Sequence, residues 1–474
     1  MATAEKQPHR SPGPMGPPGR MGGRRPGMDR DLTKGSIVGN LWILTWPTTI
    51  SSLIMVIGPM IDMIWVGSLG SAAIAGVGVS GMAVMVIDSA RMGLNTGTRA
   101  LLARSVGAGD NQTANHVGQQ AIVVSTLFSL VTAAIGIFFA ESILILLGVE
   151  PDVVIEGATY MRILFVGSIV TSFGMIAMGI MQAAGDAVMP MNISLGTRII
   201  HIALCPFLVF GWWIFPKMGV SGAALTNVIS QSIAGVIGLW VLFTGRTRLK
   251  MSLKGFSFDG DIIWRMVKIG IPSSITGMER SVANFVLMWI IVPFGTAAVA
   301  AHSLAQRIDM FVNMPAMGLG QSAGILAAQN LGAGQPDRAE KTGWIAAALF
   351  TCVSIIGSLI IWFLAENVVQ IFNREPKLVE LTAAFLRIDI VSYLVFGLVM
   401  VLMNCLNGVG DTYIPMWTTL LTMWLVQVPM AYVLPKVTSL GVYGVRWGIV
   451  SAIVLRAVVY TIYFKKGRWK RKEV

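Results

Sequence analysis

The stretch Gly70-Ser71-Ala72-Ala73 returns 225 residues later as Gly295-Thr296-Ala297-Ala298. The same offset pairs proline with proline and glycine with glycine on both sides of this stretch. It joins Pro47 to Pro272, Gly107-Ala108-Gly109 to Gly332-Ala333-Gly334, and Pro190-Met191 to Pro415-Met416. Because the register holds without a gap from Pro47 to Met191, the sequence indicates an internal duplication.

The composition predicts that the duplicated unit lies in a membrane. Of 474 residues, 54% are hydrophobic and 12% are charged, and the mean hydropathy is +0.71. Soluble domains are far more polar. If half of the chain spans the bilayer at about 20 residues per helix, about twelve transmembrane helices follow. Apolar runs lie near 41–66, 73–96, 117–140, 160–182, 192–212, 221–243, 269–293, 297–321, 342–364, 384–407, 416–434 and 442–464.

The reactive side chains predict no enzyme. The three cysteines (Cys205, Cys352 and Cys405) are isolated within apolar runs, so they form neither a disulfide framework nor a zinc motif. The four histidines form no pair at metal-ligand spacing, and the HExxH and GxSxG motifs are absent. We therefore expect no catalytic residue, no bound metal and no cofactor.

Both ends of the chain are basic. Residues 1–34 are rich in Pro, Gly, Met and Arg and contain no apolar run, which predicts a disordered tail and no cleaved signal peptide. Residues 465–474 are also basic, as is the start of the connection 246–268. Basic flanks mark the cytoplasmic side of a membrane protein. We therefore expect both termini and this linker in the cytoplasm, and we interpret the net charge of +12 as membrane topology and not as nucleic-acid binding.

The repeat also predicts the architecture. Each copy holds six spans, an even number, so both copies enter the membrane in the same orientation. An axis along the membrane normal then relates them, as in some secondary transporters. We expect an all-α polytopic fold with two lobes, residues 35–245 and 269–464, although a duplication without transport is the alternative. No GxxxxGK[ST] phosphate-binding motif is present, so an ion gradient is the expected energy source.

Several short motifs are typical of one family. Trp46-Pro47 opens the first span, and the second half contains the runs Phe294-Gly295-Thr296-Ala297-Ala298-Val299-Ala300-Ala301-His302 and Gln329-Asn330-Leu331-Gly332-Ala333-Gly334. With the paired Gly185-Asp186 and Gly410-Asp411, they resemble the MATE (multidrug and toxic compound extrusion) family over residues 36–464. The resemblance implies a V-shaped, two-lobe exporter that exchanges Na⁺ or H⁺ for organic cations or other drugs. We expect it to act as a monomer in the cytoplasmic membrane.

Ionisable groups inside spans are costly, so each is a candidate for function. In the first lobe Asp62, His201, Cys205 and Thr226 are placed so that they could share one pocket. The resemblance assigns a coupling site to the first-span Asp together with an Asn-x-x-x-Asp pair in the fifth span. Here His201 and Cys205 replace that pair, which favours H⁺ over Na⁺ as the coupling ion. The alternative is that His201 only forms a hydrogen bond to a neighbouring helix.

The second lobe offers a different set of ionisable residues. Glu279, Arg280 and Arg307 lie near the middle of their spans, and Glu279 and Arg307 could form a buried ion pair with either a structural or a coupling role. Asp389 is expected near the outer surface, in contact with water.

Three prolines are candidate hinges. Pro47, Pro59 and Pro272 each remove a hydrogen bond from a span and could let it bend. The alternative is that membrane helices simply tolerate proline.

The sequence favours one function and leaves a second open. The favoured function is an antiporter that exports drugs or organic cations across the cytoplasmic membrane. The alternative is a flippase for lipid-linked oligosaccharide or polysaccharide precursors, which would need a more cationic cavity. The small number of arginines expected inside the lobes favours the exporter.

Overall fold

The computed structural model describes residues 31–146, 148 and 151–472, and all regular structure within these ranges is helical. Most of the predicted N-terminal tail therefore lies outside the described residues. The first half contains α1 (Ile37–Gly67), α2 (Ser71–Gly107), α3 (Asn111–Leu146), α4 (Pro151–Val166), α5 (Ser168–Ala183), α6 (Val188–Phe210) and α7 (Val220–Thr244). The second half contains α8 (Gly260–Ile291), η1 (Val292–Phe294), α9 (Thr296–Gly332), α10 (Pro336–Gln370), α11 (Pro376–Gly408), α12 (Tyr413–Thr422), η2 (Met423–Gln427), α13 (Val428–Val437), α14 (Tyr443–Lys466) and η3 (Arg468–Arg471).

These helices form the twelve spans of a two-lobe fold. Two spans are interrupted: α4 and α5 meet at a 48° bend, and α12 continues into α13 through the π turn η2. Pro429 follows that turn and has no N–H to donate to it, which accounts for the widened helix. Among the described residues, ten helices qualify by length and apolarity alone, and counting α4 and α5 together as one span gives eleven. The twelfth is α9, which is 37 residues long but carries polar residues such as Gln306 and Asp309.

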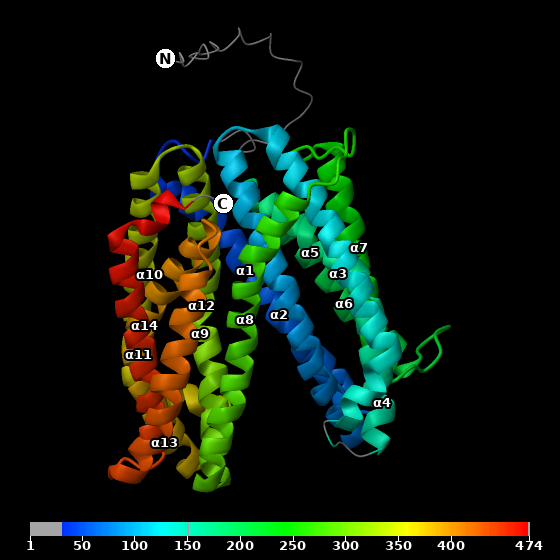
Figure 1. Ribbon diagram of the computed structural model, residues 1–474. Coiled ribbons are helices and arrows are strands. Elements are labelled where there is room, and N and C mark those ends of the chain that lie inside the picture. The colour runs from blue at the N-terminus through cyan, green and yellow to red at the C-terminus, as the bar shows by residue number, and fades with distance from the viewer. Residues whose placement is uncertain (1–30, 147, 149–150, 473–474) are drawn as a thin grey trace, which may run out of the picture.

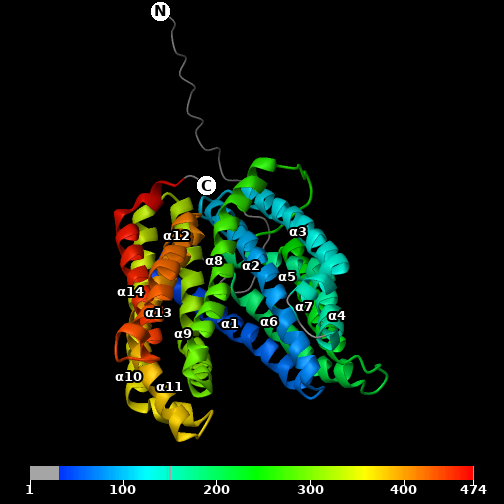
Figure 2. The ribbon, with the colours of Figure 1, turned by 60° about the horizontal axis from the view of Figure 1, so that its bottom comes forward.

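The two halves form separate bundles that meet at one end and diverge at the other (Figure 1). One bundle contains α1 to α7 and the other contains α8 to α14. The first and last parts of the described chain lie together at the joined end, where Leu32 and Trp469 belong to one buried apolar cluster. We call this end the terminal face. The V shape and the two bundles are also visible when the molecule is turned (Figure 2).

The halves meet in a symmetric contact between α2 and α9. A Cβ atom on Gly107 would lie 2.0 Å from the carbonyl oxygen of Gln329, and one on Gly332 would lie 2.0 Å from the carbonyl oxygen of Arg104. The repeat relates the two contacts, because Gly332 follows Gly107 by 225 positions and Gln329 follows Arg104 by the same number. The backbones can approach this closely only because both sites are glycine. The two helices therefore cross on the pseudo-twofold axis that the parallel repeat predicts.

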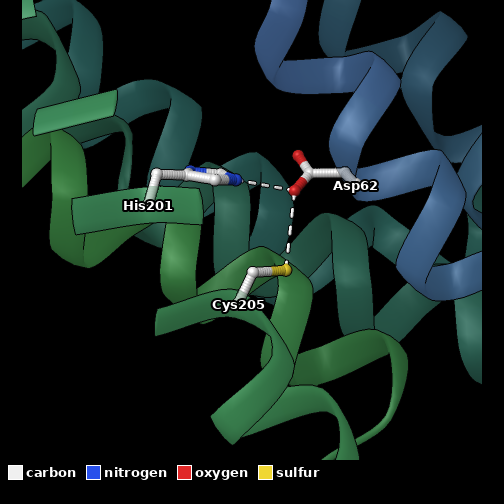
Figure 3. A group of neighbouring side chains, drawn as sticks. All are labelled: Asp62, His201 and Cys205. Atoms are coloured by element: carbon white, nitrogen blue, oxygen red, sulfur yellow. Dashed lines mark hydrogen bonds and ion pairs between the residues drawn. The ribbon is translucent and has the colours of Figure 1, made fainter. Parts of the chain in front are cut away.

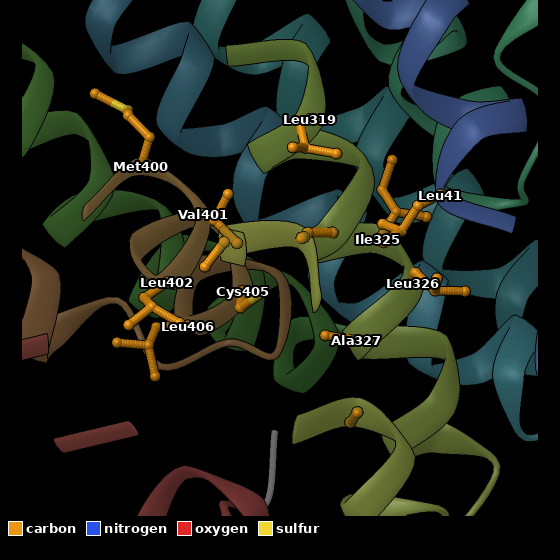
Figure 4. Packing of buried hydrophobic residues seen from close by; sticks show 14 of the residues in the cluster. Leu41, Leu319, Ile325, Leu326, Ala327, Met400, Val401, Leu402, Cys405 and Leu406 are labelled. Carbon is orange, nitrogen blue, oxygen red and sulfur yellow. The ribbon is translucent and has the colours of Figure 1, made fainter. Parts of the chain in front are cut away.

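The first helix of each half connects the two bundles. Near the terminal face α1 packs on α9, where the Thr48 hydroxyl lies 3.1 Å from the Ser322 hydroxyl. In the same way α8 packs on α2, with Gly270 against Gly93. Leu41 of α1 belongs to a large cluster formed with α9 and α11, including Leu326 and Leu402 (Figure 4). Toward the open end α1 leaves this cluster and packs against α6, which belongs to the same half of the chain.

Candidate functional site

Asp62, His201 and Cys205 form a buried group between α1 and α6 (Figure 3). The Nε2 atom of His201 lies 2.7 Å from Oδ1 of Asp62, and the Cys205 thiol donates to the same oxygen at 3.8 Å. The side chains of His201 and Asp62 are 2% and 8% exposed. A histidine and a carboxylate are thus held in direct contact, away from bulk water.

Helix geometry accounts for this arrangement. His201 and Cys205 are four residues apart on α6, so they share one face, and that face meets Asp62 on the last turns of α1. Thr226 on α7 is buried beside Cys205, and its hydroxyl donates to the Gly222 carbonyl at 2.7 Å. The structure therefore brings together all four residues singled out in the first lobe.

Other ionisable groups face this site from three helices. Arg198 lies one turn before His201 on α6, and its guanidinium covers Gly58 of α1. Tyr160 of α4 interacts electrostatically with Asp62 and Cys205, and Asp88 of α2 interacts in turn with Tyr160. Asp88 is paired with Arg91, which lies three residues further along the same helix. Arg198 was not singled out from the sequence, although an arginine one turn from His201 within an apolar run indicates a candidate site residue.

The donor atoms fit proton exchange better than Na⁺ binding. The oxygen, nitrogen and sulfur atoms of Asp62, His201 and Cys205 lie within 4.8 Å of one another, close enough for one ion to contact all three. Only the carboxylate offers the oxygen ligands that hard cations prefer. Histidine, in contrast, gains and loses a proton readily near neutral pH.

The second lobe contains a cavity of about 290 Å³, lined by both charged and apolar side chains, between α8, α9, α11, α14 and the interrupted span α12–η2. Its deepest charge is Arg446, whose side chain is 2% exposed. Arg446 Nη1 donates to Asp389 at 2.9 Å and to Asp309 at 3.3 Å, and the Tyr393 hydroxyl donates to Asp309 as well. Asp309 and Arg446 were not singled out from the sequence.

The expectation that Asp389 is in contact with water is wrong. The apolar run begins at residue 384, but α11 begins at Pro376, which places Asp389 thirteen residues, or about 20 Å, along the helix. The residue is 3% exposed and paired with Arg446. Charged residues such as Lys377 and Glu380 made the start of the helix look like a loop.

The predicted ion pair between Glu279 and Arg307 is also wrong. Among the described residues no hydrogen bond reaches either carboxylate oxygen of Glu279, which is buried. Arg307 is exposed and does not line the cavity. The charges acting on Glu279 come from its neighbour Arg280, which lines the cavity as well, and from Arg456 of α14.

A comparison with protein families identifies the fold. The model described as MatE matches residues 47–207 and 272–433, once in each half. This chain belongs to the MATE family. It is therefore a multi-pass membrane protein of a family of transporters that move small molecules.

Several MATE relatives are bacterial proteins named as probable multidrug resistance proteins. The chain is 26% identical to the probable multidrug resistance protein YoeA of Bacillus subtilis, over 95% of this chain and 98% of that protein. It is 23% identical to the probable multidrug resistance protein NorM of Thermotoga maritima, over 91% and 93%. A crystal structure of MATE in the bent conformation superposes with a TM-score of 0.87 at 24% identity, covering 94% of this chain and 98% of that one. That likeness shows the MATE fold.

Proposed function

We propose that the protein is a secondary antiporter that exports drugs, or other organic molecules with a cationic group, in exchange for H⁺. The observation that carries the proposal is the buried contact between Asp62 and His201. A carboxylate and an imidazole in contact can share one proton, and the protonated and deprotonated states of the pair differ in charge. Such a difference lets a proton gradient change the relative stability of two conformations.

We further propose that the terminal face is cytoplasmic. It carries the basic C-terminal segment and the connection between α7 and α8, where Arg246 and Lys250 lie. The bundles diverge on the opposite side, so this conformation is the outward-facing one. Alternating access then requires α1 and α8 to change how they cross between the bundles. Pro47 and Pro272 are buried at equivalent positions in these two helices, and we propose that they act as hinges; Pro59 remains a candidate without a described side chain.

One observation favours the flippase alternative. The second-lobe cavity contains three arginines, Arg280, Arg446 and Arg456, which is more than the sequence led us to expect. Arg446 is neutralised by two carboxylates, so two guanidiniums remain for an anionic headgroup. Export of a fluorescent drug from vesicles that lack any lipid-linked sugar would contradict a strict flippase.

The coupling ion can be tested with purified protein in proteoliposomes. A pH gradient and a Na⁺ gradient are imposed separately, with the membrane voltage clamped, and movement of a fluorescent drug that carries a cationic group is recorded. We expect the pH gradient alone to drive transport. Transport driven by Na⁺ alone at fixed pH would contradict the proton assignment.

The role of Asp62 can be tested in the same vesicles. Asp62→Asn removes the carboxylate and keeps its shape, so gradient-driven transport should be lost while substrate binding stays measurable. Asp110→Asn, in the exposed turn after α2, is the matched control and should transport at the parent rate. Parent-rate transport by Asp62→Asn would remove this residue from the mechanism.

A further inference from the structure

Three ionisable side chains that line the second-lobe cavity, Glu279, Arg280 and Arg456, form no ion pair within the described residues. Glu279 is 6% exposed, and neither of its carboxylate oxygens accepts a hydrogen bond from the described residues. Arg456 donates through Nε to the Thr422 hydroxyl at 2.6 Å, a neutral partner. Within the described part of the chain, no carboxylate lies within ion-pair distance of Arg280 or Arg456. A buried carboxyl group without a hydrogen bond is costly, so Glu279 points to a ligand that supplies its partner.

The remaining charges of the cavity are already satisfied. Arg446 is held by Asp389 and Asp309, and it also donates to the His302 carbonyl at 3.3 Å. The groups left for a ligand are therefore one carboxylate, from Glu279, and two guanidiniums, from Arg280 and Arg456. Both guanidiniums act electrostatically on Glu279, and all three residues line the same cavity, where one ligand can reach them.

An apolar wall completes the cavity. Met400, Met403 and Met423 line it together with Phe396 and Ile453. Methionine side chains are flexible and polarisable, so such a wall can pack against apolar groups of differing shape. The cavity thus combines a charged recess of both signs with an adaptable apolar surface.

We propose that this cavity binds amphipathic zwitterions, with an acid group at Arg280 and Arg456, an ammonium at Glu279 and an apolar body against the methionines. A simple cation would leave two guanidiniums unpaired and would be repelled by them. A simple anion would leave Glu279 unpaired. Only a molecule with both charges satisfies all three groups. The inference rests on the proposed export function and narrows its substrate class.

Equilibrium binding to the purified protein in detergent tests this inference. Three probes share one fluorophore: Nε-dansyl-lysine is a zwitterion, dansylglycine is an anion and dansyl-ethylenediamine is a cation. Because each charge-assisted hydrogen bond lost costs roughly tenfold or more in affinity, we expect the zwitterion to bind about tenfold tighter than either other probe. Equal or tighter binding of the cation would overturn the proposal.

Three variants assign the charges. Glu279→Gln should remove the advantage of the zwitterion over the anion, and Arg456→Gln should remove its advantage over the cation. Arg280→Gln should act like Arg456→Gln and is exposed, so it is expected to fold. Arg387→Gln, at an exposed ion pair with Glu366, is the control and should leave all three affinities unchanged. Weakening of all three probes to the same extent by the arginine variants would overturn the proposal.

The zwitterion could be a free molecule or a lipid headgroup. Displacement of Nε-dansyl-lysine by a hydrophobic amino-acid amphiphile, but not by lysophosphatidylethanolamine, would identify a free zwitterion, and the reverse would identify a lipid. Displacement by neither would overturn the proposal. Because these measurements use no gradient, they do not depend on Asp62 or on proton coupling. A failure of the coupling proposal leaves the predicted affinities unchanged, and a failure here leaves the antiport test unchanged.

Discussion

Arg446 is the buried cation that holds Asp309 and Asp389 together in the second lobe. Arg446→Met would leave two carboxylates close together without their cation, and breaking a buried pair in this way costs about 3–5 kcal/mol. We expect a clear fall in the thermal unfolding temperature in detergent. Adding Asp309→Asn and Asp389→Asn should recover much of that loss.

An exposed ion pair provides the comparison for Arg446. Arg162 and Glu141 lie 2.8 Å apart at the surface of the first lobe, so Arg162→Met should cost less than about 1 kcal/mol. We expect Arg162→Met to unfold at nearly the parent temperature. If Arg446→Met also unfolded at the parent temperature, the buried pair would have no stabilising role.

His201 is the residue whose replacement should change the pH dependence of transport. His201→Asn keeps a hydrogen-bonding group next to Asp62 but removes the imidazole, which is the proton-exchanging partner in the proposed pair. We expect transport to persist with a shifted pH profile. His116→Asn is the control, because His116 contacts Asp259 at 3.2 Å near the terminal face, far along the sequence from Asp62. A parent-like profile for His201→Asn would support the alternative that His201 is only a structural hydrogen-bond partner.

At the level of helices, the crossing of α2 and α9 depends on glycine. In Gly332→Ala the added carbon would lie 2.0 Å from the Arg104 carbonyl oxygen, so one backbone must move. Overpacking of this kind costs about 1–3 kcal/mol. We expect a lower unfolding temperature, with the same effect for Gly107→Ala because its contact is equivalent.

Gly357 of α10 is the matched control for this crossing. A Cβ there would meet no atom within 4 Å, so Gly357→Ala should be neutral or should stabilise the helix by about 0.5–1 kcal/mol. An unfolding temperature for Gly332→Ala equal to that of Gly357→Ala would show that the lobes do not depend on this close approach.

The sequence predicted helix pairing better than side-chain pairing. The offset of 225 matched Gly107 to Gly332, and the structure places both at one crossing. The pattern could not predict Glu279 beside Arg456, because depth along two helices does not fix how each helix is rotated about its axis. Asp389 was misplaced for another reason: α11 extends beyond its apolar run, so the end of hydrophobicity was not the end of the helix. In the first lobe the sequence was sufficient to select Asp62 and His201 as candidate site residues, because ionisable residues are rare in apolar runs.

For the molecule as a whole, the parallel repeat makes a prediction about sidedness. Asp110 and Gln335 lie in the equivalent turns after α2 and α9, at the terminal face. Cysteine at either position should react with a membrane-impermeant maleimide only from the cytoplasmic side. Lys217→Cys, in the connection between α6 and α7 at the other end, should react only from outside. The parent chain measures the labelling that comes from the native cysteines Cys205, Cys352 and Cys405. Reaction of the Asp110 or Gln335 position from outside would contradict both the proposed orientation and the parallel repeat.

The packing of α1 against α9 also bears on how the protein is made. Thr48 and Ser322, which touch, are 274 positions apart. At synthesis rates of about 5–20 residues per second, the ribosome needs on the order of 15 to 55 s between them. During that time the first span waits in the bilayer with its Leu41 face uncovered by its final partner. The first copy therefore cannot mature before the second is made, and a defect in α9 is expected to affect the biogenesis of both halves.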